Sequence, residues 1–193
     1  MIRIAVVGDI GSGKSYIANL FGYPVFNADF EVAKIYKTNK SCFRRLKKIL
    51  PKYFSVFPAN KIQIIKAIKA SEKNLKKITK IIHPEIRKKL IIFLKKNKQK
   101  KAVVLDIPLL LENKLNLKND IIVFVQSKKG DIIKNLKKRD NFNLSLYNQF
   151  KKIQLPLDYK KKNSNHIIKN NFTNNLNKKN VKKKKKKIIK KER

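Results

Sequence analysis

Eight residues near the start of the chain combine glycines, a lysine and a serine at a spacing suited to phosphate binding. Residues 8–15 read Gly-Asp-Ile-Gly-Ser-Gly-Lys-Ser and complete the pattern Gly-x-x-x-x-Gly-Lys-Ser/Thr. In such a loop, glycines let backbone N–H groups approach phosphate oxygens, Lys14 reaches the β- and γ-phosphates, and the Ser15 hydroxyl joins the shell of a Mg²⁺ ion. The segment therefore predicts a nucleoside triphosphate site. The residues expected to hold the nucleotide are Gly8, Gly11, Ser12, Gly13, Lys14, Ser15 and Tyr16.

Two of the 12 acidic residues follow predicted strands, at the edge of the sheet where the loop is expected. Asp29 comes just after a short predicted strand at 25–26. It either takes or orients the proton of an acceptor hydroxyl, or it caps the helix that follows. Asp106 ends the apolar run 102–105 and either holds Mg²⁺ through water or caps a turn before Pro108. The residues alone leave both alternatives open.

Arg139 and His83 are the other side chains that are rare enough to examine singly. The chain has 44 lysines but 6 arginines, and Arg139 either reaches the transferred phosphoryl group or forms a surface ion pair. The pair His83-Pro84 favours a structural or substrate-positioning role for His83 over acid–base chemistry. We also expect Pro84 to begin a helix that covers residues 85–96.

Short apolar runs separated by helical patterns must position these residues. Continuous apolar strands alternating with helices are typical of a parallel sheet covered on both faces, so the sequence predicts an α/β fold. The phosphate loop lies between a predicted strand and a predicted helix, as its function requires. The predicted strands are Ile2–Val7, Val25–Phe26, Ala102–Leu105, Ile121–Val125 and His166–Ile168.

A net charge of +38 is the most unusual overall property of the chain. Such charge is typical of proteins that bind nucleic-acid backbones, yet arginine, the residue best suited to reading bases, is scarce. Lys, Asn and Ile dominate the composition, as they do when codons are rich in A and T. We therefore attribute most of the charge to composition and expect no nucleic-acid partner, although a positive cleft would still attract polyanionic substrates.

The rest of the composition restricts where the protein works. No apolar run reaches the ~18 residues of a membrane span, and the first residues do not resemble a signal peptide, so we expect no membrane partner. Cys42 is the sole cysteine, which excludes an internal disulfide and a thiolate metal cage. We expect a cytoplasmic protein that is a monomer or a weak homo-oligomer.

Several segments, taken in order, resemble the dephospho-coenzyme A kinase family. The phosphate loop is generic to P-loop kinases, whereas the other segments make the resemblance specific. The segments are Gly8–Ser15, Asn27–Asp29, His83–Ile86, Asp106–Glu112, Arg139–Asp140, Gln154–Pro156 and Ile167–Asn171. The resemblance implies ATP-dependent phosphorylation of the ribose 3′-hydroxyl of dephospho-coenzyme A, the last step of coenzyme A biosynthesis.

The resemblance also implies an architecture, that of a P-loop NTPase. It is a three-layer α/β/α fold with a five-stranded parallel sheet, a helical substrate-binding insertion and a small lid. The expected core covers residues 1–29, 99–138 and 161–181, the helical part 30–98 and the lid 139–160. A Lys-rich tail at 182–193 is expected to fray.

Roles for single residues follow from the same resemblance. Asp29 is implied as the base toward the 3′-hydroxyl, Lys14 and Arg139 contact the phosphates, and Ser15 binds Mg²⁺. The adenine of ATP is implied near Asn170. The residues implied to bind the acceptor are Asp29, His83, Asp106, Pro108 and Leu109.

The chain departs from the family pattern at three of the aligned positions. Asn27 stands where the family usually has aspartate, and Ile132 and Asn135 stand where it commonly has glutamine and arginine. Lost arginine contacts would weaken substrate binding, because lysine lacks the planar fork of a guanidinium. Three alternatives remain open: another small-molecule P-loop kinase, a nucleic-acid-binding protein that uses a nucleotide as a switch, and an inactive relative.

Overall fold

The computed structural model describes residues 1–138 and 142–191, and these form two compact units. The first unit comprises Met1–Asn27 and Asn97–Arg193, and the second comprises Ala28–Lys96. Each unit has its own helices and its own buried apolar residues. None of the described helices is long and apolar enough to cross a membrane.

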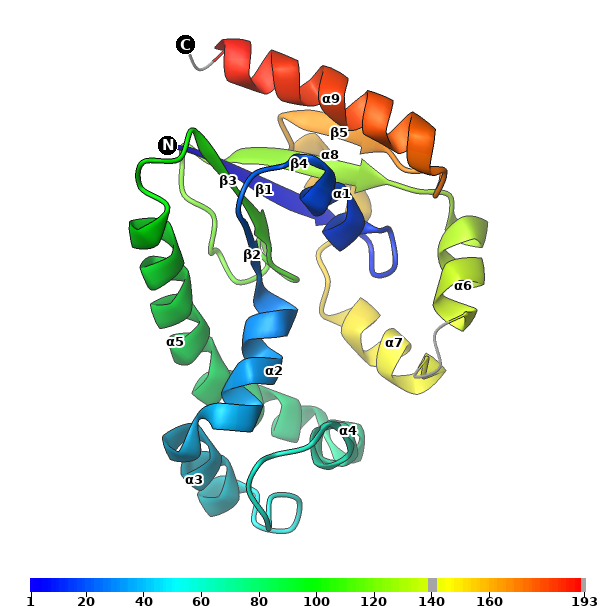
Figure 1. Ribbon diagram of the computed structural model, residues 1–193. Coiled ribbons are helices and arrows are strands. Elements are labelled where there is room, and N and C mark those ends of the chain that lie inside the picture. Colours follow the sequence, from blue (N-terminus) through cyan, green and yellow to red (C-terminus); the bar gives the residue numbers. More distant parts are fainter. Residues whose placement is uncertain (139–141, 192–193) are drawn as a thin grey trace. The chain divides into compact units, whose positions relative to one another are not determined.

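The first unit is built on a parallel sheet of five strands in the order β2-β3-β1-β4-β5. Each neighbouring pair runs parallel, which confirms the predicted α/β fold (Figure 1). The central strands have continuous buried runs because helices cover both faces of the sheet. The strands are β1 (Ile2–Gly8), β2 (Val25–Asn27), β3 (Ala102–Asp106), β4 (Ile121–Gln126) and β5 (His166–Lys169).

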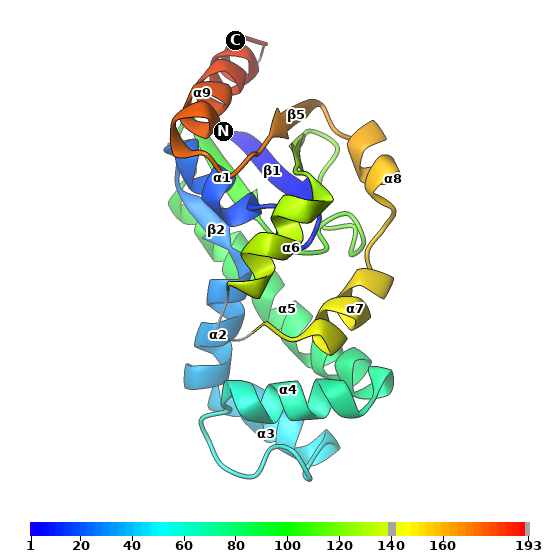
Figure 2. The same ribbon diagram turned by 90° about the vertical axis from the view of Figure 1, so that its right-hand side faces the viewer.

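Helices from distant parts of the chain cover this sheet. Figures 1 and 2 show α1 (Lys14–Leu20) and α9 (Asn174–Lys191) on one face and α8 (Leu157–Lys162) on the other. On the first face Ile17 and Phe21 join alternate residues of the strands and Val181 in one apolar core. The described part of this unit also contains α6 (Lys129–Lys137) and α7 (Leu144–Lys152).

The Lys-rich end of the chain forms part of the folded unit as far as the structure describes it. Helix α9 continues to Lys191, and Ile188 is buried in the same core as Val181. The expectation that the segment frays is therefore wrong over residues 182–191. Val181 and Ile188, seven positions and two turns apart, keep one side of this helix on the apolar core although most of its other residues are lysines.

The second unit consists of helices in its described residues. They are α2 (Ala28–Thr38), α3 (Lys40–Ile49), α4 (Lys61–Ala70) and α5 (Glu72–Lys96), and α5 packs against the other three. Asn39 and Asn60 cap α3 and α4 by accepting hydrogen bonds from backbone N–H groups.

The expectation that Pro84 begins a helix is wrong, because α5 runs through it without interruption. Proline removes one backbone hydrogen bond inside a helix, which usually breaks it. Here a stripe of buried residues continues on both sides of the proline, so packing outweighs the lost bond. The stripe is Leu75, Ile78, Ile81, Ile82, Ile86 and Leu90.

Candidate functional site

The loop of residues 8–15 connects β1 to α1 in a conformation that depends on its glycines. Gly11 and Gly13 have φ angles of +79° and +83°, in the left-handed region that favours glycine. A Cβ atom at Gly13 would lie 2.3 Å from Nδ2 of Asn170, and one at Gly11 would lie 2.8 Å from Cγ of Leu136. Neighbouring side chains therefore leave no room for anything larger than glycine at these two positions.

The lysine of the loop turns back over the loop itself. Helix α1 begins at Lys14, whose Nζ donates to the carbonyl oxygens of Asp9 at 2.7 Å and Gly8 at 3.5 Å. The ammonium group thus lies against the backbone that would surround a phosphate chain. This geometry suits the predicted role of Lys14 on the β- and γ-phosphates.

Asp106 lies beside the loop at the end of β3 and is 3% exposed. Its Oδ2 accepts a hydrogen bond from Nδ2 of Asn27 at 2.8 Å. Burial raises the pKa of this carboxyl, while a hydrogen bond from Ser15, the charge of Lys14 and the bond from Asn27 act to lower it. Asp106 therefore interacts with both Ser15 and Lys14, the two residues of the phosphate loop with predicted roles in the reaction.

The contact with Asp106 explains why asparagine works at position 27. Asn27 and Asp106 are direct partners in the parallel pairing of β2 with β3. An aspartate at 27 would place a second carboxylate against the buried one, and like charges at this distance raise each other's pKa. The amide of Asn27 instead donates a hydrogen bond and helps to keep Asp106 ionised.

The pair Ser15–Asp106 fits a Mg²⁺ ion. Mg²⁺ prefers hard oxygen ligands, and with a nucleotide it takes one or two protein oxygens, phosphate oxygens and waters. A hydroxyl hydrogen-bonded to a buried carboxylate supplies such a donor set. The described residues contain no cluster of three or more His, Cys, Asp or Glu side chains that would form an all-protein metal cage.

Asn170 supports the loop from β5. This residue is 2% exposed, and its Nδ2 donates to the carbonyl oxygen of Ser12 at 2.7 Å. Its Oδ1 accepts from the backbone of Phe172 and from Asn177, so both ends of the amide are engaged. Ser127 donates a second hydrogen bond to the same Ser12 carbonyl. Ser12 itself is fully buried, and a contact of Asn170 with adenine remains a prediction.

The positions that depart from the family pattern on α6 have structural roles here. Ile132 is buried and lies beside Gly11, where it forms part of the floor under the loop. Asn135 donates a hydrogen bond to the carbonyl oxygen of Asp131 one turn earlier.

Tyr16, on α1, is among the residues expected to hold the nucleotide. Its hydroxyl donates a hydrogen bond to Oδ1 of Asn174 at the start of α9.

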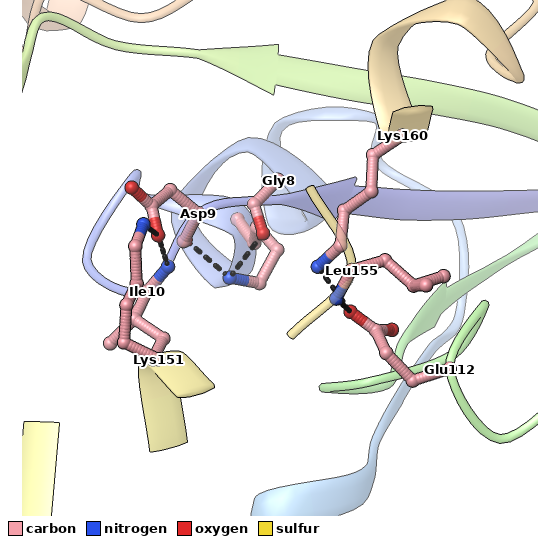
Figure 3. A network of polar contacts seen from close by, with 8 residues as sticks. Gly8, Asp9, Ile10, Glu112, Lys151, Leu155 and Lys160 are labelled. Carbon is pink, nitrogen blue, oxygen red and sulfur yellow. Dashed lines mark hydrogen bonds and ion pairs between the residues drawn. The ribbon is translucent and has the colours of Figure 1, made fainter. Parts of the chain in front are cut away.

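The segment after β3 contains the predicted acceptor residues Pro108 and Leu109, followed by Glu112. Leu109 has a φ of +57°, a backbone conformation that is uncommon for residues other than glycine. Such conformations tend to cluster at functional sites. Glu112 is almost buried, and its Oε1 lies 2.5 Å from Nζ of Lys160 and accepts from the backbone N–H of Leu155 at 3.0 Å. Figure 3 shows both contacts, from Lys160 on α8 and from Leu155 just before that helix.

Three of the predicted site residues, Asp29, His83 and Arg139, do not belong to the group of contacts described above. Asp29 and His83 belong to the second unit, Asp29 in the first turn of α2 and His83 in the middle of α5. Burial and the charge of Arg87 lower the pKa of His83, which favours the neutral imidazole. Arg139, like Asp140, lies outside the described residues.

Sequence reasoning missed the lysines that contact this site. Nζ of Lys151, on α7, lies 2.5 Å from Oδ1 of Asp9, the second residue of the loop. Lys160 pairs with Glu112 in the same way from α8. No signal in the sequence could have distinguished these two among 44 lysines.

The chain matches known proteins over most of its length. The model of the dephospho-CoA kinase family matches residues 2–176. The chain is 34% identical over 170 residues to the dephospho-CoA kinase of Wolbachia pipientis wMel, covering 86% of this chain and 87% of that protein.

Solved structures share the fold. A Thermus thermophilus protein superposes with a TM-score of 0.78 at 24% identity, covering 98% of this chain and 97% of that one. A dephospho-CoA kinase from Campylobacter jejuni gives a TM-score of 0.64 at 22% identity, with 96% of each chain covered. The match of the family model over most of the residues, with the relative at 34% identity, shows that the chain belongs to the dephospho-CoA kinase family.

Proposed function

We propose that this protein transfers the γ-phosphoryl group of ATP to the ribose 3′-hydroxyl of dephospho-CoA and so produces CoA. The proposal combines membership of the family with a complete phosphate loop. The observation that carries it is the group formed by Lys14, Ser15 and Asp106, in which an ammonium group and a hydroxyl lie near a buried carboxylate.

Each residue of this group has a task in phosphoryl transfer. Lys14 would exchange its contacts with the loop carbonyls for the β- and γ-phosphates and offset their charge. Ser15 would bind Mg²⁺, and Asp106 would hold a water of the ion or orient Ser15. A bound Mg²⁺ would supply positive charge that offsets the charge developing during transfer.

The acceptor side rests on the resemblance to the family. We propose that Asp29 accepts or orients the proton of the 3′-hydroxyl, with His83, Pro108 and Leu109 as further contacts to dephospho-CoA. Arg139 is proposed to contact the transferred phosphoryl group. Residues 139–160, which include α7, are proposed as a lid whose closure excludes water during transfer.

The direct test is an acceptor panel with purified protein, ATP and Mg²⁺. We expect a 3′-phosphorylated product from dephospho-CoA and none from nucleosides, nucleoside monophosphates or shikimate. Omission of Mg²⁺ should abolish the product. Transfer to a nucleotide but not to dephospho-CoA would favour another small-molecule kinase, and no transfer to any acceptor would contradict the proposal.

The role of Asp29 can be tested separately. We expect Asp29→Asn to lower kcat by about 10²–10⁴-fold, the usual contribution of a positioned acid or base, while the Kd for ATP stays unchanged. The matched control is Glu31→Gln, which removes an acidic side chain from the same first turn of α2. Turnover near the wild-type rate would mean that Asp29 only stabilises the first turn of α2, where a negative charge is favourable.

A further inference from the structure

One contact near the loop has no part in the function proposed so far. Oδ1 of Asp9 lies 2.5 Å from Nζ of Lys151 and also accepts the backbone N–H of Ile10 at 2.7 Å (Figure 3). The Asp9 side chain is 11% exposed and that of Lys151 is 38% exposed. The ion pair therefore joins α7 to the second residue of the phosphate loop.

An acid at this position opposes the purpose of the loop. A phosphate-binding loop attracts anions through its N–H groups and its lysine, and a carboxylate within it repels them. The repulsion is strong here because Asp9 is almost buried and water screens it little. The same residue is bound to Lys14 through its carbonyl oxygen at 2.7 Å, so the carboxylate is close to the group that must receive phosphate.

We propose that Lys151 is a positioning residue for the nucleotide, which neutralises Asp9 and thereby lets the loop accept a triphosphate. Lys151 acts through Asp9, so its importance depends on the negative charge at position 9. The same ion pair brings α7 onto the loop, which links neutralisation of the loop to the position of the lid segment. The inference rests on nucleotide binding by the loop and not on the identity of the acceptor.

A rival explanation makes a different prediction. If Lys151 left Asp9 and bound a phosphate oxygen directly, its loss would weaken binding whether or not position 9 carried a charge. Neutralisation predicts instead that removing the charge of Asp9 makes Lys151 dispensable. Asp9→Asn suits this purpose because asparagine keeps an oxygen that accepts the N–H of Ile10.

The experiment is a double-mutant cycle on the Kd for Mg²⁺-ATP, measured by titration calorimetry without an acceptor. We expect Lys151→Met to weaken binding about tenfold, which corresponds to a coupling within the usual range for contacting residues. Asp9→Asn should bind at least as tightly as the wild type, and the double variant should match Asp9→Asn. In turnover assays Lys151→Met should raise the KM for ATP and leave kcat nearly unchanged.

The control is a neighbouring lysine, and each contrary outcome has its own signature. Lys152→Met removes the same charge from the next, exposed position of α7 and should not change the Kd. Equal losses for Lys151→Met in the wild-type and Asp9→Asn backgrounds would overturn the proposal in favour of direct phosphate contact, and no loss in the wild-type background would also overturn it. If the wild type binds ATP but transfers nothing to dephospho-CoA, only the proposed reaction fails. If it binds no nucleotide, both proposals fail.

Discussion

Two lysine–carboxylate pairs hold the segment after α6 to the rest of the first unit. They have the same nitrogen–oxygen distance but differ in how deeply the lysine is buried. The distance between nitrogen and oxygen is 2.5 Å in both Lys160–Glu112 and Lys151–Asp9. The Lys160 side chain is 2% exposed, whereas that of Lys151 is 38% exposed. We call Lys160–Glu112 the inner pair and Lys151–Asp9 the outer pair. Glu112 also accepts a hydrogen bond from the backbone N–H of Leu155, so the inner pair holds backbone as well as side chains in place.

The comparison indicates that burial determines whether an ion pair contributes mainly to the stability of the fold or to the charge of a neighbouring site. Two buried charges lose their hydration, and either one without its partner is left in a medium that solvates it poorly. In the pair Lys151–Asp9 the lysine is partly exposed, so water still solvates its ammonium group and the pair contributes little to folding. The carboxylate of Asp9 is nearly buried, so its charge still acts on the phosphate loop to which it belongs. The inner pair is therefore structural, and the outer pair is suited to adjust the charge of the loop.

The largest expected effect is loss of the inner lysine. Lys160→Met should lower the free energy of unfolding by about 3–5 kcal/mol, because it leaves the carboxylate of Glu112 buried and unpaired. The double variant Lys160→Met/Glu112→Gln should recover most of the loss, since glutamine is neutral and still accepts the N–H of Leu155. Urea denaturation of the three proteins measures both changes.

The exposed neighbour Lys161 provides the control for this prediction. Lys161→Met should leave the midpoint of the urea transition unchanged within error. An equal loss in the Lys161 and Lys160 variants would contradict the assignment of a structural role to the buried pair, as would a double variant that is less stable than Lys160→Met.

Asp106 is a buried carboxylate whose hydrogen-bond donors include the neutral side chains of Ser15 and Asn27. Burial raises its pKa above 3.8. Between 3.8 and the raised pKa the unfolded chain is ionised while the folded protein keeps its proton. The contribution of Asp106 to stability is therefore full below pH 3.8 and is lost as the pH rises through the folded pKa.

The measurement compares wild type with Asp106→Asn by urea denaturation from about pH 3 to about pH 7. Asparagine does not titrate, so the variant should gain stability relative to wild type as the pH rises. Each unit by which the pKa is raised corresponds to about 1.4 kcal/mol. A stability difference that does not change with pH would show that burial does not penalise this carboxylate.

The smallest expected effect is loss of the outer lysine on folding. Lys151→Met should lower the free energy of unfolding by less than about 1 kcal/mol, and the difference should shrink further at high salt. Urea denaturation at low and high NaCl measures it, with Lys152→Met as the reference. A loss as large as that of Lys160→Met would erase the distinction between the two pairs.

The sheet could be predicted from the sequence because its signals are local. Apolar runs such as Ile121–Val125 are continuous where a strand is covered on both faces, and β4 covers those residues. Pro84 shows the limit of local rules. Proline disfavours a helix interior, but the packing of the residues around it on α5 involves other helices that no short sequence window contains.

The candidate site divides along the same line. Lys14 and Ser15 could be found because they complete a glycine-rich phosphate-loop pattern, and Asp106 because one of the 12 acidic residues follows directly on a predicted strand. The resemblance implies adenine near Asn170, which stays a prediction, and the structure adds a hydrogen bond from the Asn170 amide to the carbonyl of Ser12. The two residues are 158 positions apart, so only folding brings them together.

By itself the sequence determined the parallel sheet and the phosphate loop, because both are specified by the types and spacing of adjacent residues. Only the tertiary structure decided that Lys151 and Lys160, among 44 lysines, contact Asp9 and Glu112. Lys151 and Asp9 are 142 positions apart, and nothing in the sequence around either one indicates the other. The strength of a charge depends on how much water remains around it, and burial is a property of the packed chain.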